Sequence, residues 1–371
     1  MAATKTSNTG SAWRTTVTPI AALILLALVW GRDLAPALVG VVALVLIAAV
    51  LVAVHHAEVV AHRVGEPLGS LILAVAVTVI EVGLILSLMI SGGPDTAGLA
   101  RDTVFAAVMI TCNGIVGLCL VVGALRHGIV AFNAEGSSGA LATVVALATL
   151  CLVLPSVTTS SLGPTFSGSQ LAFAAIVSLA LYSVYVFVQT VRHRDYFLPV
   201  PAEDEPPTEG EVEVHLPPPS TRAALLSLVL LTISLVAVVG LAKTVSPAIE
   251  SGVTAIGAPL SAVGVAIALV VLLPETLAAV RAATRDRLQT SYNLALGSAL
   301  ASIGLTIPVI AVAMIWLPGP LVLGLNPTEM VLLALSALVG TLTVVAGRAT
   351  VLQGAVHLLI FLSFLFTAVT P

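Results

Sequence analysis

Two glutamates stand alone inside long apolar stretches of this chain, and their type and position could support chemistry. Glu81 follows Leu68 by about 13 residues in LGSLILAVAVTVIEVGLILSLMIS, and Glu275 follows Leu260 by about 15 in PLSAVGVAIALVVLLPETLAAV. A charge at the centre of a bilayer costs about 2.5 to 3.5 kcal/mol even on the mild insertion scale. The pair therefore predicts a site for cations or protons. The alternative is a protonated glutamate bonded to a neighbouring helix, or a glutamate nearer the interface.

Neutral oxygen donors occur in the apolar stretch that follows each glutamate. Asn113 is alone at mid-depth of RDTVFAAVMITCNGIVGLCLVVGAL, whereas Ser298 and Ser302 share one helical face of TSYNLALGSALASIGLTIPVIAV. A structural role is the alternative for each serine, because membrane serines often bond their own backbone. Pro274, directly before Glu275, frees a backbone carbonyl that could bind a cation, and a simple packing kink is the alternative.

Small residues flank Ser298, and Gly297, Ala299 and Ala301 would allow another helix to approach closely. All the candidate ligands are oxygen donors, which suits calcium with its six to eight oxygens. Neither a thiolate pair nor a buried imidazole cluster argues for zinc or copper. The same carboxylates can carry protons once the metal leaves, so the pattern predicts exchange of a cation for protons.

Membrane helices must position these residues. The chain of 371 residues is 58% hydrophobic and only 9% charged, whereas soluble domains carry about 25% charged residues. Apolar runs of bilayer-crossing length recur from end to end, and helices satisfy their backbone polar groups internally. The composition predicts an all-α polytopic membrane protein. It excludes nucleic-acid binding, because no basic stripe with interleaved aromatics occurs.

Eleven apolar spans are expected, at residues 18–31, 36–54, 68–91, 103–125, 139–157, 170–190, 222–243, 259–280, 291–316, 328–346 and 352–370. The first could pass for a signal peptide with a weak cleavage-like site at Ala35-Pro36-Ala37, but we favour a retained helix. The one long polar segment, 192–221, is rich in proline and acid and predicts a flexible linker.

The Lys and Arg residues predict the orientation of the chain. With the N-terminus in the cytoplasm, the inside segments hold 11 of these residues and the outside loops hold 3. Cytoplasmic loops of membrane proteins carry such an excess of positive charge. The N-terminus and the linker are therefore expected inside, and the C-terminus outside.

The two halves of the chain share a motif. HHAEVVAHRVGEPL (55–68) and PAIESGVTAIGAPL (247–260) both carry Glu, six residues, then Gly-x-Pro-Leu. Five spans separate the copies, an odd number, so their orientations are opposite, as in secondary transporters with a midplane site. The expected organisation is an N-terminal tail and extra helix (1–33), a first five-helix repeat (34–191), the linker (192–221) and a second repeat (222–371).

The chain resembles the calcium/cation antiporter superfamily, and within it the proton-coupled, ChaA-type bacterial calcium (sodium or potassium)/proton antiporters. The resemblance is carried by GEPLGSLILAVAVTVIEV, RDTVFAAVMITCNGIVGL, QTVRHRDYF, LLPETLAAVRAA and LQTSYNLALGSALASIGLTIP. It implies inverted five-helix repeats, a multi-pass protein of the bacterial inner membrane, and a cytosolic acidic segment, which 203–213 resembles.

The family motifs place functional residues on this chain. Glu81 and Glu275 stand at the Glu positions of a Gly-Asn-x-x-Glu-like signature, but the Asn before each is absent. Asn113 matches a Ser-Asn position and Gly297–Ser298 match the Gly-Ser of the second repeat, where Ala301 replaces a Gln. These missing oxygen ligands leave room for sodium or potassium at the site.

We therefore expect a secondary active transporter that exchanges cytoplasmic calcium for external protons by alternating access. Glu81 and Glu275 would bind cation and protons in turn, without a cofactor. The first alternative is a sodium or potassium/proton antiporter using the same site. A second, an intramembrane metalloenzyme suggested by His56-Ala57-Glu58 and His62, lacks an HExxH motif. A scaffolding role would leave the buried glutamate pair unexplained.

Overall fold

The structure is a computed structural model that describes residues 9–32, 34–65, 68–92, 96–198, 219–255, 257–317 and 319–370. The chain forms two compact units. The first comprises Met1–Ile80 and Pro217–Ala248, and the second comprises Glu81–Leu216 and Ile249–Pro371. Each repeat expected from the sequence contributes to both units, so the division into repeats stays a prediction.

The first unit contains α1 (Thr9–Val29), α2 (Pro36–Val64), the first half of α3 (Leu68–Gly92) and most of α9 (Thr221–Ala255). His56 of α2 lies 3.2 Å from the hydroxyl of Ser227 on α9 and 3.1 Å from the carbonyl of Thr15 on α1. Its ring therefore joins three helices, which is a structural role.

Two helices are longer than the sequence predicted. The expected spans ended at residues 54 and 243, but residues 55–64 continue α2 and residues 244–255 continue α9. The helix α2 ends only at Gly65, whose φ of 78° lies in the left-handed region that glycine tolerates. Both of the motif copies that the two halves share thus begin inside a long helix.

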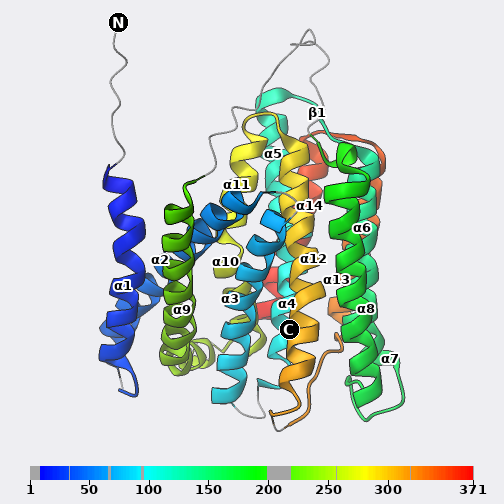
Figure 1. Cartoon of the computed structure of the whole chain (residues 1–371). Coiled ribbons are helices and arrows are strands. Elements are labelled where there is room, and N and C mark those ends of the chain that lie inside the picture. Colours follow the sequence, from blue (N-terminus) through cyan, green and yellow to red (C-terminus); the bar gives the residue numbers. More distant parts are fainter. Residues whose placement is uncertain are drawn as a thin grey trace, which may run out of the picture. The chain divides into compact units, whose positions relative to one another are not determined.

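The second unit is built around α12 (Leu288–Ala313), which packs against α4, α6, α8 and α11 (Figure 1). Its other elements are α4 (Leu99–Met109), η2 (Ile110–Ile115), α5 (Val116–His127), β1 (Val130–Ala131), α6 (Ala134–Ala148), η3 (Thr149–Val153), α7 (Leu154–Val157), α8 (Gly168–Phe187), η4 (Val188–Arg192), η5 (Arg194–Phe197), α10 (Ser261–Val271), α11 (Leu273–Ala283), α13 (Pro327–Val345), β2 (Arg348–Ala349) and α14 (Val351–Val369).

Three helical runs contain π-helical turns, namely η2 within α4–α5, η3 within α6–α7 and η4 at the end of α8. Such turns are rare and occur frequently at functional sites. The helices α8, α13 and α14 begin with capping boxes, which satisfy the exposed amide groups of their first turns.

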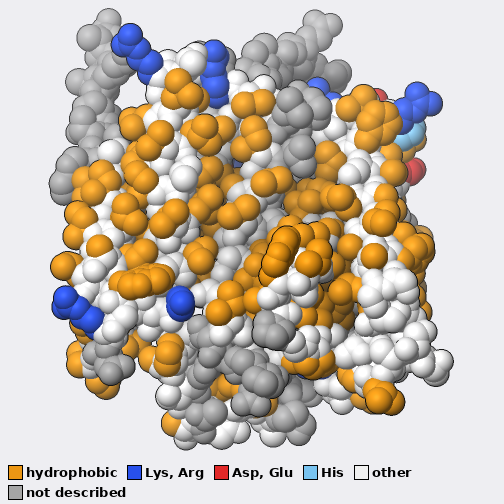
Figure 2. Space-filling model, turned by 60° about the horizontal axis from the view of Figure 1, so that its bottom comes forward, with side chains coloured by type: hydrophobic (Ala, Val, Ile, Leu, Met, Phe, Trp, Pro, Cys, Tyr) orange, Lys and Arg blue, Asp and Glu red, His pale blue; other side chains and the backbone are white. Residues whose placement is uncertain are grey.

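The class of fold is confirmed. In the described part of the chain, nine helices or helical runs are long and apolar enough to cross a membrane, and the bent pair α10–α11 makes a tenth. The first expected span, 18–31, corresponds to the apolar helix Thr15–Val29, which is shorter than the nine. Large apolar side chains are exposed along the helices, including Leu179, Leu342, Leu359 and Phe366, and Figure 2 shows many exposed hydrophobic side chains spread over one face.

The connecting loops of the second unit gather at two ends. At one end β1 pairs antiparallel with β2, with Val130 opposite Ala349. At the other end Thr165 forms an antiparallel bridge with Val322, and Arg101 donates to the carbonyl of Gly324. These ends are called the β end and the Arg101 end below.

The segment expected as a flexible linker begins later than predicted. Residues 192–198 end η4 and form η5, where the amide of Asn293 donates to the carbonyl of Phe197 at 2.6 Å and the Phe197 ring is buried. Aromatic residues in this stretch supply the apolar surface that packs. Residues 199–218, including the acidic residues 203–213, lie outside the described residues.

Candidate functional site

Glu81 is buried in the second unit, with 4% of its surface exposed. It lies on α3, and two hydroxyls of α12 donate to its carboxylate. Ser302 donates to Oε1 at 2.5 Å and Thr306 donates to Oε2 at 3.3 Å. Each carboxylate oxygen thus has a donor, which is how a buried acidic group is tolerated in an apolar setting. This contact joins the glutamate of one half of the chain to polar residues of the other half.

The hydroxyls follow one face of α12 at a spacing of four residues. Ser298 is half-buried one turn before Ser302, and Thr306 is fully buried one turn after it. Sequence reasoning singled out the two serines and missed Thr306, although the same spacing extends to it. The signal was present but incomplete, because threonine is common in membrane helices as a backbone-bonded residue.

Glu275 lies in the first turn of α11, directly after a break in the helix. The axes of α10 and α11 differ by 52°, and Leu272 between them leaves the helical conformation. Pro274 has no N–H to offer to the preceding turn, so the sequence's expectation of a disturbed helix at this residue is confirmed. A carboxylate in a first turn is favoured by the helix dipole.

Glu275 is half-buried and its helix packs against α12. Ser291 on α12 donates to the carbonyl of Ala279 on α11 at 2.7 Å, which fixes the register of these antiparallel helices. Counting back one turn on α11 and forward one turn on α12 places Glu275 alongside residue 295. It therefore lies within about a turn of Ser298 along the helix axis.

Asn113 is fully buried in the π-helical turn η2. Its Nδ2 donates to the Ser336 hydroxyl on α13 at 2.8 Å, and its Oδ1 lies 3.2 Å from Nδ1 of His357 on α14. The Ser336 hydroxyl donates in turn to the carbonyl of Leu332. Because an amide oxygen only accepts, the Nδ1 of His357 is the donor in this orientation.

The structure thus brings together part of the predicted site. Glu81 and Ser302 are in contact, whereas the side-chain hydrogen bonds of Asn113 run to α13 and α14. Sequence reasoning missed Ser336 and His357, because a single serine or histidine near the end of the chain carries no spacing signal. Whether Asn113 also meets a cation stays a prediction.

The prediction that Gly297 permits close helix contact is wrong. A Cβ added at Gly297 would meet only the Tyr185 hydroxyl, at 3.9 Å, which is an ordinary contact. The close approach between α12 and α8 is at Gly304, where a Cβ would lie 2.6 Å from that of Tyr182. Crowding is set by the crossing point of the two helices, which a stripe of small residues does not locate.

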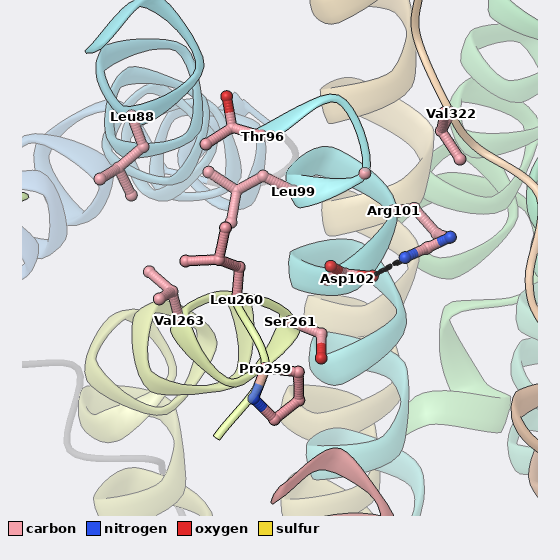
Figure 3. Close-up of a pocket in the computed structure, with 11 residues that line it drawn as sticks. Leu88, Thr96, Leu99, Arg101, Asp102, Pro259, Leu260, Ser261, Val263 and Val322 are labelled. Carbon is pink, nitrogen blue, oxygen red and sulfur yellow. Dashed lines mark hydrogen bonds and ion pairs between the residues drawn. The ribbon is translucent and has the colours of Figure 1, made fainter. Parts of the chain in front are cut away.

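A separate cavity of about 310 Å³ lies at the Arg101 end. It is bounded by the end of α3, the start of α4 and the start of α10, and it contains Asp102, Thr96 and Ser261 among its polar lining residues (Figure 3). Arg101 pairs with Asp102 at 2.7 Å. Neither residue stands out in the sequence, because an adjacent Arg-Asp pair at a helix start is usually solvated.

Oxygen atoms are the groups around Glu81 that could bind a cation. These residues contain no group of three or more His, Cys, Asp or Glu side chains that could hold a metal ion. The cluster around Glu81 offers one carboxylate and two hydroxyls. Such a set is part of the oxygen shell that a hard cation requires.

Comparison with known proteins identifies relatives over nearly the whole chain. The profile of the family described as "Sodium/calcium exchanger protein" matches residues 34–191 and 226–370 of this chain. The chain is 50% identical over 323 residues to a protein of Sinorhizobium fredii named as an ionic transporter, y4hA, covering 87% of this chain and 86% of that one. It is 33% identical over 352 residues to the sodium-potassium/proton antiporter ChaA of Escherichia coli, covering 94% of each.

Solved structures share the fold. Native YfkE superposes with a TM-score of 0.69 at 18% identity, over 96% of this chain and 100% of that one. The H+/Ca2+ exchanger CAX superposes with a TM-score of 0.70 at 17% identity, over 97% of this chain and 89% of that one. At these identities the likeness concerns the arrangement of helices alone.

Proposed function

Because the chain belongs to the sodium/calcium exchanger family, and is therefore a multi-pass cation antiporter and not an enzyme, we propose that it exchanges calcium for protons across a bacterial inner membrane. Glu81 and Glu275 bind the cation and protons in turn during alternating access. Calcium leaves the cytoplasm as protons enter. No cofactor takes part, since the ions are the substrates.

The observation that carries this proposal is the contact of Glu81 with Ser302 and Thr306. A hydroxyl has one donor and two lone pairs, so it can serve the carboxylate in two ways. Without a cation, it donates to the ionised carboxylate. With a cation present, it can rotate and offer a lone pair as a ligand. With a proton on Glu81, it can accept from the carboxylic acid. One set of atoms thus accommodates both substrates, but not together.

Glu275 is proposed as the second carboxylate because of the break that precedes it. The unwound residue Leu272 accepts two hydrogen bonds from Thr276, through the backbone N–H at 2.9 Å and the hydroxyl at 2.7 Å. The missing N–H of Pro274 leaves the carbonyl of Val270 without its usual helical donor, and among the described residues only the N–H of Leu272, shared with Ala268, is directed to it. Broken helices of transporters coordinate cations with such carbonyls.

The loop pairings support an inverted repeat. In the proposed repeats, β1 lies between the third and fourth helices of the first, and β2 between the fourth and fifth of the second. At the opposite end the assignments are exchanged: Thr165 lies between the fourth and fifth helices of the first repeat, and Val322 between the third and fourth of the second. A two-fold axis in the membrane plane produces this exchange, and such symmetry underlies alternating access.

The charges support a cytoplasmic β end. Arg126 lies there, and its guanidinium donates to the carbonyl of Thr284. The loop after α11 and the strand β2 add further basic residues, namely Arg285, Arg287 and Arg348. The Arg101 end has fewer basic residues in the described second unit. An excess of positive charge inside is typical of membrane proteins and supports the proposed cytoplasmic N-terminus and external C-terminus.

A sodium or potassium/proton antiporter is the second candidate. It is favoured by the 33% identity to a protein named for sodium and potassium. The chemistry of the site also allows it, because Ala301 stands where the resemblance implies a glutamine ligand. A poorer ligand set weakens binding of a divalent ion more than that of a monovalent one.

Proton flux in proteoliposomes tests the proposal. Vesicles of purified protein with a trapped pH-sensitive dye receive calcium, sodium or potassium in turn, and Glu81→Gln is the inactive control. Calcium-driven proton movement that Glu81→Gln lacks supports the proposal. Movement driven by sodium or potassium alone supports the second candidate. Inserted wild-type protein that moves protons with none of the three cations refutes both.

A further inference from the structure

The cavity at the Arg101 end lies along the same face of α3 as Glu81. Leu88, which lines it, lies seven residues after Glu81 on α3. Seven residues are about two helical turns, so both side chains project from one face of α3, about 10 Å apart along its axis. Between them lie Leu84 and Ile85, which are buried. The cavity thus lies over the Glu81 face, separated from it by one apolar turn.

The cavity holds a carboxylate with a spare oxygen. Asp102 is 9% exposed, and both of its contacts with Arg101, from Nε and Nη2, use Oδ1 at 2.7 Å. Oδ2 has no hydrogen-bond or ion-pair partner among the described residues. Figure 3 shows it turned away from Arg101, towards the start of α10. An ionised carboxylate that has one unpaired oxygen in a cavity favours the binding of a cation there.

The backbone holds Asp102 in this place. A Cβ at Gly264 of α10 would lie 2.9 Å from that of Asp102, so only glycine lets α10 pack this close to α4. The Ser261 hydroxyl lines the same cavity. A volume of about 310 Å³ has room for about ten water molecules of ~30 Å³ each, enough for a hydrated ion.

The β end of α12 has no matching acid. Asp102 is the acid in the first turn of α4, which begins the third helix of the first repeat, whereas the first turn of α12, the third helix of the second repeat, has no acid. Ser291 is buried, and its hydroxyl donates to the carbonyl of Ala279. An acid that served only to pack the start of a helix would have no reason to line a cavity at one end and be replaced by a neutral residue at the other.

We propose that this cavity is the external vestibule of the exchanger and that Asp102 recruits a hydrated cation within it. Arg101 occupies Oδ1 and limits the attraction, while Oδ2 receives the ion. The inference rests on the proposed function. Glu329, at the start of α13, interacts electrostatically with both Arg101 and Asp102, so the local charge of the three side chains is negative and favours cations.

Transport from each face of the membrane tests the assignment. Right-side-out and everted vesicles give the half-saturating cation concentration on the external and cytoplasmic faces separately. Loss of one negative charge lowers the local cation concentration by a factor that grows exponentially with the charge of the ion. Asp102→Asn should therefore raise the external half-saturating concentration about threefold for sodium or potassium and about tenfold for calcium. The cytoplasmic value and the maximal rate should stay within about twofold of the wild-type values.

Two further variants distinguish an effect of charge in the cavity from a folding defect. Arg101→Gln should lower the external half-saturating concentration, an opposite sign that no folding defect produces. Asp286→Asn is the matched control, because Asp286 is an exposed acid at the β end whose φ of 58° asparagine also tolerates. It should leave the external value unchanged.

Three results would contradict the assignment of this cavity as the external vestibule. The first is an Asp102→Asn variant whose half-saturating cation concentration changes equally on both faces, and the second is one in which only the maximal rate falls. The third is an Arg101→Gln variant that does not bind the external cation more tightly. Wild-type vesicles that show no cation-driven proton flux would instead defeat the proposed function, so the two failures are distinguishable.

Discussion

Removing the Ser302 hydroxyl should weaken cation binding strongly and selectively. In Ser302→Ala, Glu81 loses its shorter hydrogen bond, 2.5 Å, and keeps only the 3.3 Å contact from Thr306. The same hydroxyl is the proposed ligand in the cation-bound state, and a polar contact of a hydroxyl with a charged group contributes about 1.5 to 3 kcal/mol. At 1.4 kcal/mol per factor of ten, the half-saturating cation concentration should rise about 10- to 150-fold. The maximal rate should change less, since both carboxylates remain.

The companion variant Thr306→Val gives a graded comparison. Its contact lies near the outer limit of hydrogen-bond distance and should be worth only about 0.5 to 1 kcal/mol, or about two- to fivefold in concentration. The matched controls are Ser363→Ala and Thr341→Val, because these exposed hydroxyls bond only the carbonyls of their own helices. Both controls should behave as the wild type.

The assay is cation-driven proton flux in everted vesicles, titrated with calcium, sodium and potassium at fixed pH. The order of effect should be Ser302→Ala, then Thr306→Val, then the controls. If Ser302→Ala resembles Ser363→Ala, the hydroxyl is only a packing contact and the proposed switching between donor and ligand is wrong. A larger effect for Thr306→Val would also contradict the order of the two distances.

Three further predictions follow from the site. Glu81→Gln and Glu275→Gln should each abolish exchange while inserted protein remains at wild-type level, because Gln keeps the size but loses charge and titration; wild-type flux removes that residue from the site. Asn113→Ala should raise the half-saturating cation concentration more than it lowers the maximal rate, and an unchanged concentration with a lower melting temperature would assign Asn113 to packing. A reporter fused after Pro371 should lie outside and one inserted in 203–213 inside, and finding both on one side would contradict the inverted repeat.

The sequence predicts the fold well because the membrane imposes a strong pattern. Apolar runs of bilayer length need no knowledge of partners, so every expected span coincides with a helical run. The ends of α2 and α9 were placed too early, since the hydropathy falls where the helices continue. The local backbone conformation, as at Gly65, determines where such a helix ends, whereas the hydropathy of the segment does not determine it.

The candidate site could be predicted only in part. Burial of Glu81 follows from its position in an apolar run, and Ser302 follows from a polar face on a later helix. The pairing of these two residues is a contact between distant segments, which spacing within either helix does not encode. The same reason hides the bond between Asn113 and His357, and the cavity at Asp102, which three separate helices enclose.

The dependence of transport on pH connects these features in a final prediction. If cation and protons compete for Glu81, the half-saturating cation concentration must rise as the pH falls, because each protonated carboxylate is lost to the cation. Protonation also converts Glu81 from an acceptor to a donor towards Ser302 or Thr306, so both substrates cannot occupy the cluster at once. We therefore expect tighter cation binding at pH 9 than at pH 6 in the wild type. The dependence should remain in Glu81→Asp, which keeps the titrating group on a shorter stem, with weaker binding throughout. Equal half-saturating concentrations at the two pH values would place the proton path away from Glu81 and leave its contact with α12 without a role in coupling.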